Sequence, residues 1–190
     1  MARERVPPNR VPPNQGVTKG WPLLHVGAVP EVPAGGWRVT VAGAVARPLA
    51  LDWEAFLALP QTRLHADFHC VTGWSKLDND WEGVRLATLA EAAGIQPEAR
   101  FVRFADPQGY DTTVPLELAL AEGLLAHRHG GKPLEPEHGG PLRAVVPSLY
   151  AWKSCKWVTT VELLTEERLG FWELRGYHNG ADPWREERLV

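Results

Sequence analysis

Cys70 is a lone cysteine whose thiol could take part in chemistry. It lies in the stretch DFHCVTGWSK (67–76), with His69 before it and Thr72 after it. A lone cysteine can be a small buried hydrophobe, a nucleophile or a soft metal ligand. A nucleophilic thiolate needs a base within hydrogen-bond reach, and on a strand His69 would point to the opposite face. A distant histidine such as His25 or His138 could serve instead, so all three interpretations stay open.

The metal interpretation carries a condition of its own. One thiolate cannot complete the coordination of a metal, so Cys70 as a ligand requires a cofactor that brings the other donor atoms. A thiolate of this kind suits a soft or high-valent metal centre.

A second stretch, HGGPLRAVVPSLYAWKSCKWV (138–158), combines open backbone with positive charge. Two glycines follow His138 and let the backbone approach a bound group closely. Arg143 offers a planar fork for a phosphate, and Lys153 and Lys156 add point charges. The pattern predicts a site for an anionic ligand, with a solvated basic loop as the alternative.

Several common cofactor motifs are missing from the sequence. It contains no GxxxxGK[ST] or GxGxxG phosphate loop, no CxxC pair and no CxxCH haem motif. The histidines of HRH (127–129) and EPEHGG (135–140) lack the HExxH spacing of zinc sites. We therefore expect HRH to be a solvated loop.

Composition limits the class of protein. The chain has 190 residues, of which 44% are hydrophobic and 23% charged, and its net charge of −3 argues against a general nucleic-acid binder. It has no apolar run long enough for a membrane span and no apolar segment after the charged N-terminus that would make a signal peptide. Two cysteines make a disulfide framework unexpected. These features predict a cytoplasmic protein that binds no nucleic acid and has no membrane span.

The pattern of prolines and glycines divides the chain. RVPPN occurs at 5–9 and again at 10–14, and the proline pairs predict an extended arm over 1–20. This arm is either a free tail or a segment laid across a site, with Asn14 or Gln15 near it. Residues 21–190 are expected to form a single domain.

Hydrophobic periodicity within that domain predicts both helices and strands. Asp52 is a candidate N-cap and Gly94 a candidate helix stop. The expected strand over 62–68 would bring Cys70 just past its end. Because the two kinds of element mix without regular βαβ alternation, we expect an α+β fold. The expected strands are 37–43, 62–68, 100–106, 142–147 and 157–164, and the expected helices are 51–59, 86–94 and 115–125.

Two motifs together resemble a known family. The pattern C-V-x-x-W-S at 70–75 and the pattern H-G-x-P-x-R at 138–143, followed by V-V-P and K-W, are similar to the molybdenum-cofactor domain of the sulfite oxidase family. The first motif looks most like the branch that contains the bacterial methionine-sulfoxide reductase catalytic subunit. The resemblance covers roughly 20–178 and implies a sulfite-oxidase-type molybdopterin-binding fold of mixed sheets with short helices.

The resemblance also implies an activity and a set of site residues. It implies an oxidoreductase that transfers an oxygen atom to or from a small substrate, with molybdenum-molybdopterin as its cofactor and an unknown electron-transfer partner. Cys70 would be the protein ligand to molybdenum. Cys155 is expected to be a buried thiol rather than a disulfide partner of Cys70. The residues expected to contact the cofactor are Asn14, His25, His138, Arg143, Ser154, Cys155 and Lys156.

Two departures from the family pattern bear on the substrate. Sulfite oxidases carry arginines right after the metal-binding cysteine, whereas this chain has V-T-G-W at 71–74, so sulfite is not the expected substrate. Asp106 stands where the reductase branch has a threonine contact. Tyr110, Tyr150 or Trp74 could line the substrate mouth.

Two other functions compete with the molybdenum hypothesis. One is a thiol hydrolase or transferase that uses Cys70 with a distant histidine. The other is a non-catalytic module that binds an anion around 138–156. Both would work without a redox cofactor.

Overall fold

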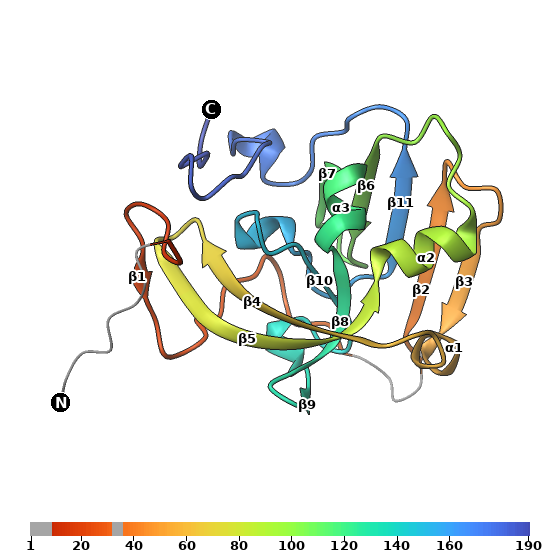
Figure 1. The fold of residues 1–190 in the computed structure, drawn as a ribbon, viewed down its shortest axis with the longest axis horizontal. Helices are drawn as coiled ribbons and strands as arrows, with labels where there is room; N and C mark the ends of the chain where they lie inside the picture. Colours follow the sequence, from red (N-terminus) through yellow and green to blue (C-terminus); the bar gives the residue numbers. More distant parts are fainter. Residues whose placement is uncertain (1–8, 32–35) are drawn as a thin grey trace.

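Two β-sheets form the frame of the molecule in the computed structural model, which describes residues 9–31 and 36–190 (Figure 1). Within these residues one sheet has six strands and the other has five. The six-stranded sheet runs β1 (Gly16–Val17), β5 (Trp74–Arg85), β8 (Leu124–His129) and β10 (Arg143–Val145), while β4 (Thr62–Cys70) pairs with β5 and β9 (Lys132–Pro133) with β8. The five-stranded sheet has the order β3 (Leu49–Asp52), β2 (Arg38–Gly43), β11 (Thr160–Leu164), β6 (Phe101–Ala105) and β7 (Asp111–Pro115).

Short helices connect these strands. Asp52 caps the first one, because its carboxylate accepts a 2.9 Å hydrogen bond from the backbone N–H of Ala55. Gly94, at a φ of 69°, ends the second one in the left-handed conformation. The mixture of sheets and short helices confirms the expected α+β class. The α-helices are α1 (Trp53–Leu57), α2 (Leu86–Ala93) and α3 (Leu116–Glu122), and the 3₁₀ turns are Pro136–His138, Ala151–Lys153 and Glu173–Arg175.

The hydrophobic core lies where the two sheets and the helices α2 and α3 meet, and these two helices pack against each other (Figure 1). Both sheets contribute fully buried side chains, such as Phe104 from β6 and Leu125 from β8. In the part of the chain that is described, no helix combines the length and apolar character needed to cross a membrane.

Two expectations from the sequence are wrong in this region. The helix expected over 115–125 ends at Glu122, because Leu124 already begins the buried strand β8. HRH (127–129) is not a solvated loop but the half-buried end of that strand. The ring of His129 packs 4.6 Å from that of Trp81, and burial lowers its pKa to about 4.

Strand β5 was missed by the sequence patterns, although it is the longest strand of the structure. Its sequence, WSKLDNDWEGVR, contains many polar residues that pattern reading assigns to loops. Some of these are paired inside the protein: the side chain of Asn79 is buried and accepts a 2.7 Å hydrogen bond from Lys76. Strands β4 and β5 form a hairpin in which Cys70 pairs with Trp74. Cys70 is therefore the last residue of β4 and stands at the hairpin tip.

The N-terminal arm lies along this hairpin over the residues that are described. Gly16 of β1 pairs in parallel with Trp74 of β5, and Arg10 forms a 2.6 Å ion pair with Asp67 of β4. The arm is thus attached to the element that presents Cys70. Residues 1–8 lie outside the described residues, and the domain boundary at residue 20 stays a prediction.

Candidate cofactor site around Cys70

A cavity of about 310 Å³ lies beside the hairpin tip that carries Cys70. It brings together seven of the eight site residues expected from the sequence, although they come from segments that are far apart in the chain. Those seven are His25, Cys70, His138, Arg143, Ser154, Cys155 and Lys156.

The thiol of Cys70 is held in a defined environment. The side chain is buried, and its sulfur lies 3.2 Å from the hydroxyl oxygen of Thr72. The side-chain amide of Gln15, from the arm, donates a 3.1 Å hydrogen bond to the Cys70 carbonyl. Cys70 and Cys155 are both free thiols, which confirms the expectation that they do not form a disulfide.

Arg143 is a buried cation that opens onto the cavity. Its guanidinium donates hydrogen bonds to the carbonyl oxygens of His138 (2.8 Å) and Ser154 (3.0 Å), and its central carbon lies 5.1 Å from the centre of the Phe68 ring. No carboxylate among the described residues forms an ion pair with it, and burial lowers its pKa to about 10. A buried charge without a counterion is costly, so an anion bound in the cavity would be strongly favoured.

Lys156 adds a second cation to the same wall. Its ammonium group donates a 2.6 Å hydrogen bond to the carbonyl oxygen of Glu137. Burial and then the nearby charge of Arg143 lower its pKa to about 7. An anionic ligand would raise this pKa again, because it favours the charged form of Lys156.

His138 and Trp74 point polar ring atoms into buried positions. The Nδ1 atom of His138 and the Nε1 atom of Trp74 are buried and have no hydrogen-bond partner among the described residues. Burial lowers the pKa of His138 to about 4, so this ring is neutral at pH 7. Because buried polar atoms are nearly always paired, these two atoms indicate a ligand that supplies their partners.

Gly139 packs closely against the side chains of both cations. Its φ is 102°, which favours glycine, and a Cβ atom would lie 3.0 Å from the Cβ of Lys156 and 3.1 Å from that of Arg143. A larger residue would therefore displace the two cations.

The loop of Ser154 and Cys155 forms the floor next to these cations. The hydroxyl of Ser154 accepts a 3.0 Å hydrogen bond from the backbone N–H of Val146, which holds the loop against the residue that follows strand β10. The thiol of Cys155 is buried, and burial raises its pKa well above its usual value. Cys155 is thus a neutral thiol in the wall, as expected.

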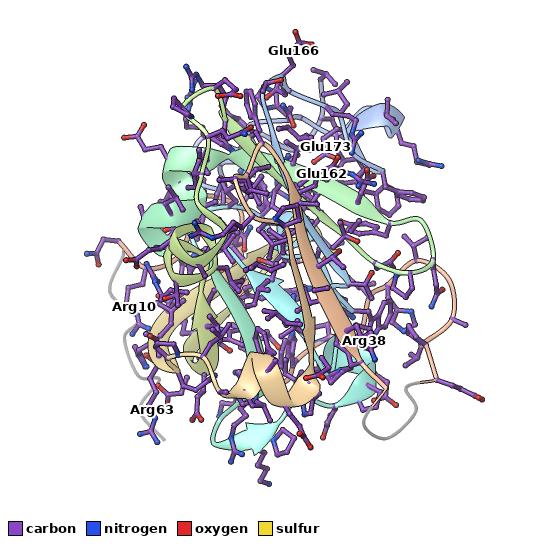
Figure 2. All side chains as sticks on the ribbon, turned by 90° about the vertical axis from the view of Figure 1, so that its right-hand side faces the viewer. Arg10, Arg38, Arg63, Glu162, Glu166 and Glu173 are labelled. Carbon is purple, nitrogen blue, oxygen red and sulfur yellow. The ribbon has the colours of Figure 1, made fainter. Side chains whose placement is uncertain are left out.

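Lys153, which the sequence suggested as a further cation of the anion site, does not line the cavity. Its buried ammonium forms a 2.6 Å ion pair with Glu173. Figure 2 shows Glu173 further inside the molecule than Glu166, which projects outward. This ion pair explains why Lys153 does not belong to the anion site, because a buried lysine needs a buried partner.

The two expected contacts from the N-terminal part differ in position. His25 lines the cavity, and its ring centre lies 5.5 Å from that of Trp157. Asn14 does not line it, and its side-chain amide donates a 2.7 Å hydrogen bond to Glu186. Its neighbour Gln15 reaches Cys70 instead. The role of Asn14 in cofactor binding stays a prediction.

The structure adds residues that sequence patterns did not assign to the cofactor. Trp21 lines the cavity and packs 3.9 Å from His138, measured between ring centres. Asp106 also lines it, and burial raises its pKa while the backbone N–H groups of Gln108 and Tyr110 donate to its carboxylate. The available signal for Trp21 was its place directly before the apolar stretch PLLHVGAVP (22–30), which also contains His25.

Of the three aromatic residues considered for the substrate mouth, Tyr110 and Trp74 line the cavity, whereas Tyr150 does not. The hydroxyl of Tyr110 donates a 2.5 Å hydrogen bond to the carbonyl of Trp152. This bond fixes the ring against the cavity wall.

The donor set fits an anionic, ring-containing cofactor. The cavity offers two cations, aromatic walls, buried polar atoms that need partners and one thiol able to bind a metal. A metallopterin with a phosphate tail needs these features, because its tail is anionic and its ring system is flat and polar at the edge.

Comparison with known proteins agrees with this fit. The family model described as "Oxidoreductase molybdopterin binding domain" matches residues 26–172. The uncharacterized oxidoreductase YuiH of Bacillus subtilis is 48% identical over 183 residues, which span 95% of this chain and 92% of YuiH. The protein-methionine-sulfoxide reductase catalytic subunit MsrP of Campylobacter jejuni is 32% identical, over 72% of this chain and 52% of MsrP. Rat mitochondrial sulfite oxidase is 35% identical, over 54% of this chain and 21% of that protein.

A solved structure shares the fold. The sulfane dehydrogenase SoxCD from Paracoccus pantotrophus matches with a TM-score of 0.69 and 25% identity, over 75% of this chain and 41% of the SoxCD chain. The match confirms the expected fold of mixed sheets with short helices. The chain belongs to the oxidoreductase molybdopterin-binding domain family and is a sulfite oxidase-like molybdopterin oxidoreductase.

Proposed function

We propose that this protein transfers an oxygen atom to or from a small substrate with a molybdenum-molybdopterin cofactor, and that Cys70 is the protein ligand to the metal. The observation that carries the proposal is that the Cys70 thiol and the buried cations Arg143 and Lys156 line one cavity. This pairing suits a cofactor with a soft metal end and an anionic tail.

Each residue of the cavity would have a defined part in holding the cofactor. Arg143 and Lys156 would bind the phosphate, and neutral His138 would pair with a polar atom of the cofactor through its free ring nitrogen. When bound, the molybdenum centre supplies the oxygen-atom transfer and the two-electron redox change. The remaining expected contacts are Asn14, His25, Ser154 and Cys155.

The protein would also control access to the metal. Cys70 sits at the tip of a hairpin whose backbone is held by the arm through Gln15, which positions the residue that carries the sulfur. The aromatic walls of the cavity would limit the access of water to a bound cofactor, and residues at the hairpin tip would face the substrate. This arrangement supports orientation of the substrate by residues near Cys70.

The branch of the family, the partner and the location are parts of the same proposal. Support for the methionine-sulfoxide reductase branch comes from the C-V-x-x-W-S motif and from the 32% identity to MsrP. Since that relative is named a catalytic subunit, we infer that a separate electron-transfer protein serves this chain as well. Cell fractionation would test the expected cytoplasmic location.

The geometry around Cys70 favours this function over a thiol hydrolase. The hydrogen-bond partner of its sulfur is the hydroxyl of Thr72, which is not a base. The ring of neighbouring His69 is held by a 2.8 Å hydrogen bond to Ser75 instead. Nucleophilic catalysis needs a base in contact with the thiol, and no histidine among the described residues forms a hydrogen bond with it.

Elemental analysis and pterin fluorescence test the proposal directly. The protein should be purified from a host that makes the molybdenum cofactor and, in parallel, from one that cannot. Near-equimolar molybdenum and pterin in the first preparation only is the expected result. Folded protein that contains neither after expression in the competent host would overturn it.

A further inference from the structure

A chain of three side-chain hydrogen bonds ends at the backbone of Cys70. The ring Nδ1 atom of His69 lies 2.8 Å from the hydroxyl oxygen of Ser75, and that hydroxyl donates a 2.7 Å hydrogen bond to Oε1 of Gln15. The Nε2 atom of Gln15 then donates a 3.1 Å hydrogen bond to the Cys70 carbonyl. The chain therefore starts and ends on neighbouring residues of β4 and passes through β5 and the arm.

The available hydrogen atoms set the direction of each bond. The Cys70 carbonyl can only accept, so it faces the amide NH2 of Gln15, and the amide oxygen faces Ser75. Ser75 has one hydroxyl hydrogen, which it donates to that oxygen. The Ser75 oxygen therefore accepts from the Nδ1–H group of His69. One arrangement thus satisfies all three bonds.

Burial makes this arrangement costly to change. Ser75 is fully buried, and only 5% of the surface of His69 is exposed. The ring of His69 also lies against that of Trp184, with 6.2 Å between the ring centres. Because a buried polar group without a partner is unfavourable, a break at Ser75 would leave both His69 and Gln15 without the contact that orients them.

The Cys70 carbonyl receives one further bond, which comes from within the hairpin. The backbone N–H of Gly73 donates to it over 3.0 Å and closes the turn, while the N–H of Gly16 in the arm donates to the Gly73 carbonyl over 2.9 Å. Figure 1 shows β1 beside the ends of β4 and β5. The peptide plane after Cys70 is therefore held from two sides, by the turn and by Gln15.

The orientation of this peptide plane matters for a metal ligand. It helps to set the backbone conformation of Cys70 and with it the direction in which the sulfur points into the cavity. Groups that hold a ligand in place also tune the metal that it binds. Gln15 acts here on the backbone of Cys70, whereas Thr72 contacts the sulfur itself.

We propose that Gln15 is a positioning residue for Cys70, that Ser75 and His69 hold it in place, and that the three together fix the angle at which the thiolate meets the metal. The inference rests on the proposed function, because the metal belongs to that function.

Electron paramagnetic resonance of the partly reduced holoenzyme tests the proposal, because the g values of the molybdenum signal respond to the geometry of its ligands. Q15L and S75A should shift these g values. Q15E should shift them as well, since its carboxylate fills the same space but cannot donate to the Cys70 carbonyl. T18V is the matched control on the arm, because the Thr18 hydroxyl bonds to the carbonyl of Gly20, and its signal should be unchanged.

A pair of variants at position 69 separates hydrogen bonding from packing. H69L removes the donor to Ser75 and should shift the g values. H69N keeps an N–H group close to the place of Nδ1 and should restore most of the original signal. If His69 only filled space, both variants would alter the signal to a similar extent.

The proposal is overturned if Q15L and S75A holoenzymes, with molybdenum bound, give the g values of the unmodified protein. Hydrogen exchange of the Gly73 amide supplies a second measurement that needs no metal. In apoprotein, Q15L should speed this exchange about fivefold, because one of the bonds that hold the hairpin tip is lost. T18V should leave it unchanged.

The two measurements also separate this proposal from the proposed function. If protein from a cofactor-competent host contains no molybdenum, the proposed function fails and exchange at Gly73 decides the role of Gln15. Faster exchange in Q15L would then leave the positioning of Cys70 standing, and an unchanged rate would overturn it too.

Discussion

The hydroxyl of Thr72 lies 3.2 Å from the sulfur of Cys70, at the tip of the β4–β5 hairpin. A hydrogen bond to a metal-bound thiolate withdraws electron density from the sulfur. Such bonds are one means by which proteins set the potential of a metal centre. Thr72 occupies an x position of the C-V-x-x-W-S motif. Its contact with the sulfur therefore gives this residue an influence on the redox potential of the proposed site.

This contact predicts that T72V lowers the molybdenum midpoint potential, because a sulfur without the hydrogen bond donates more strongly and favours the oxidised metal. A redox titration followed by electron paramagnetic resonance measures the change. T72S keeps the hydroxyl and should keep the potential. A T72V holoenzyme with an unshifted potential would show that the bond does not act on the metal.

Removing the thiol itself should separate the metal from the pterin. In C70A the cations of the cavity remain, so we expect pterin to stay bound while molybdenum is lost or its spectrum changes. Elemental analysis and fluorescence of the released, oxidised pterin measure the two components. An unchanged metal content and spectrum would rule out Cys70 as the ligand.

Arg143 should control retention of the cofactor. R143K keeps a charge but loses the planar fork, so we expect cofactor to be lost on dialysis, with an affinity at least about tenfold lower. R103K is the matched control, because Arg103 pairs with Asp111 and Glu162 on the five-stranded sheet. Pterin content after dialysis gives the answer, and full retention by R143K would contradict the phosphate role.

Lys156 should make anion binding to the apoprotein depend on pH. Its pKa of about 7 means that its positive charge is present below that pH and is lost as the pH rises through it. Sulfate affinity should therefore fall by up to about tenfold between about pH 6 and about pH 8.5. Isothermal titration calorimetry of the apoprotein with sodium sulfate measures this affinity.

In K156M the same titration should be flat over that range, since Arg143 stays charged throughout. A pH dependence that persists in K156M would mean that another group titrates. Sulfate itself keeps a constant charge under these conditions.

Breaking the buried pair of Lys153 and Glu173 should destabilise the fold. E173Q leaves the ammonium of Lys153 buried without a counterion, and it weakens the acceptor of Thr112 and Trp152. We expect a loss of about 3 kcal/mol in the free energy of unfolding, measured by urea denaturation. E166Q removes an exposed carboxylate and should leave the stability within about 0.5 kcal/mol. Equal stabilities of the two variants would contradict this role of the pair.

Much of the fold and of the site follows from local sequence. The alternation at 37–43, the Asp52 cap and the Gly94 stop specify elements that form as expected, because they depend on neighbours in the chain. The metal ligand and most of the expected cofactor residues came from two compact stretches around 70–75 and 138–156, while Asn14 and His25 came from separate matches in the N-terminal part. Such motifs can be read locally because the chemistry needs those residue types at fixed spacing.

Strand β5 and Lys153 show what local patterns miss. The polar residues of β5 read as a loop until their partners on β4 and β8 are known. Lys153 reads as an anion-binding cation until its buried partner Glu173 is placed beside it. In both cases a contact from a distant part of the chain decides the environment of the side chain.

The sequence by itself determined the family, the thiol and the cations that could hold a cofactor. Only the tertiary structure decided that Gln15 rather than Asn14 reaches Cys70, and that Arg188 stands beside Val71. The physical reason is that a side chain's charge and hydrogen bonds depend on which residues surround it. The distance between two residues along the chain does not tell whether they are in contact in the folded protein.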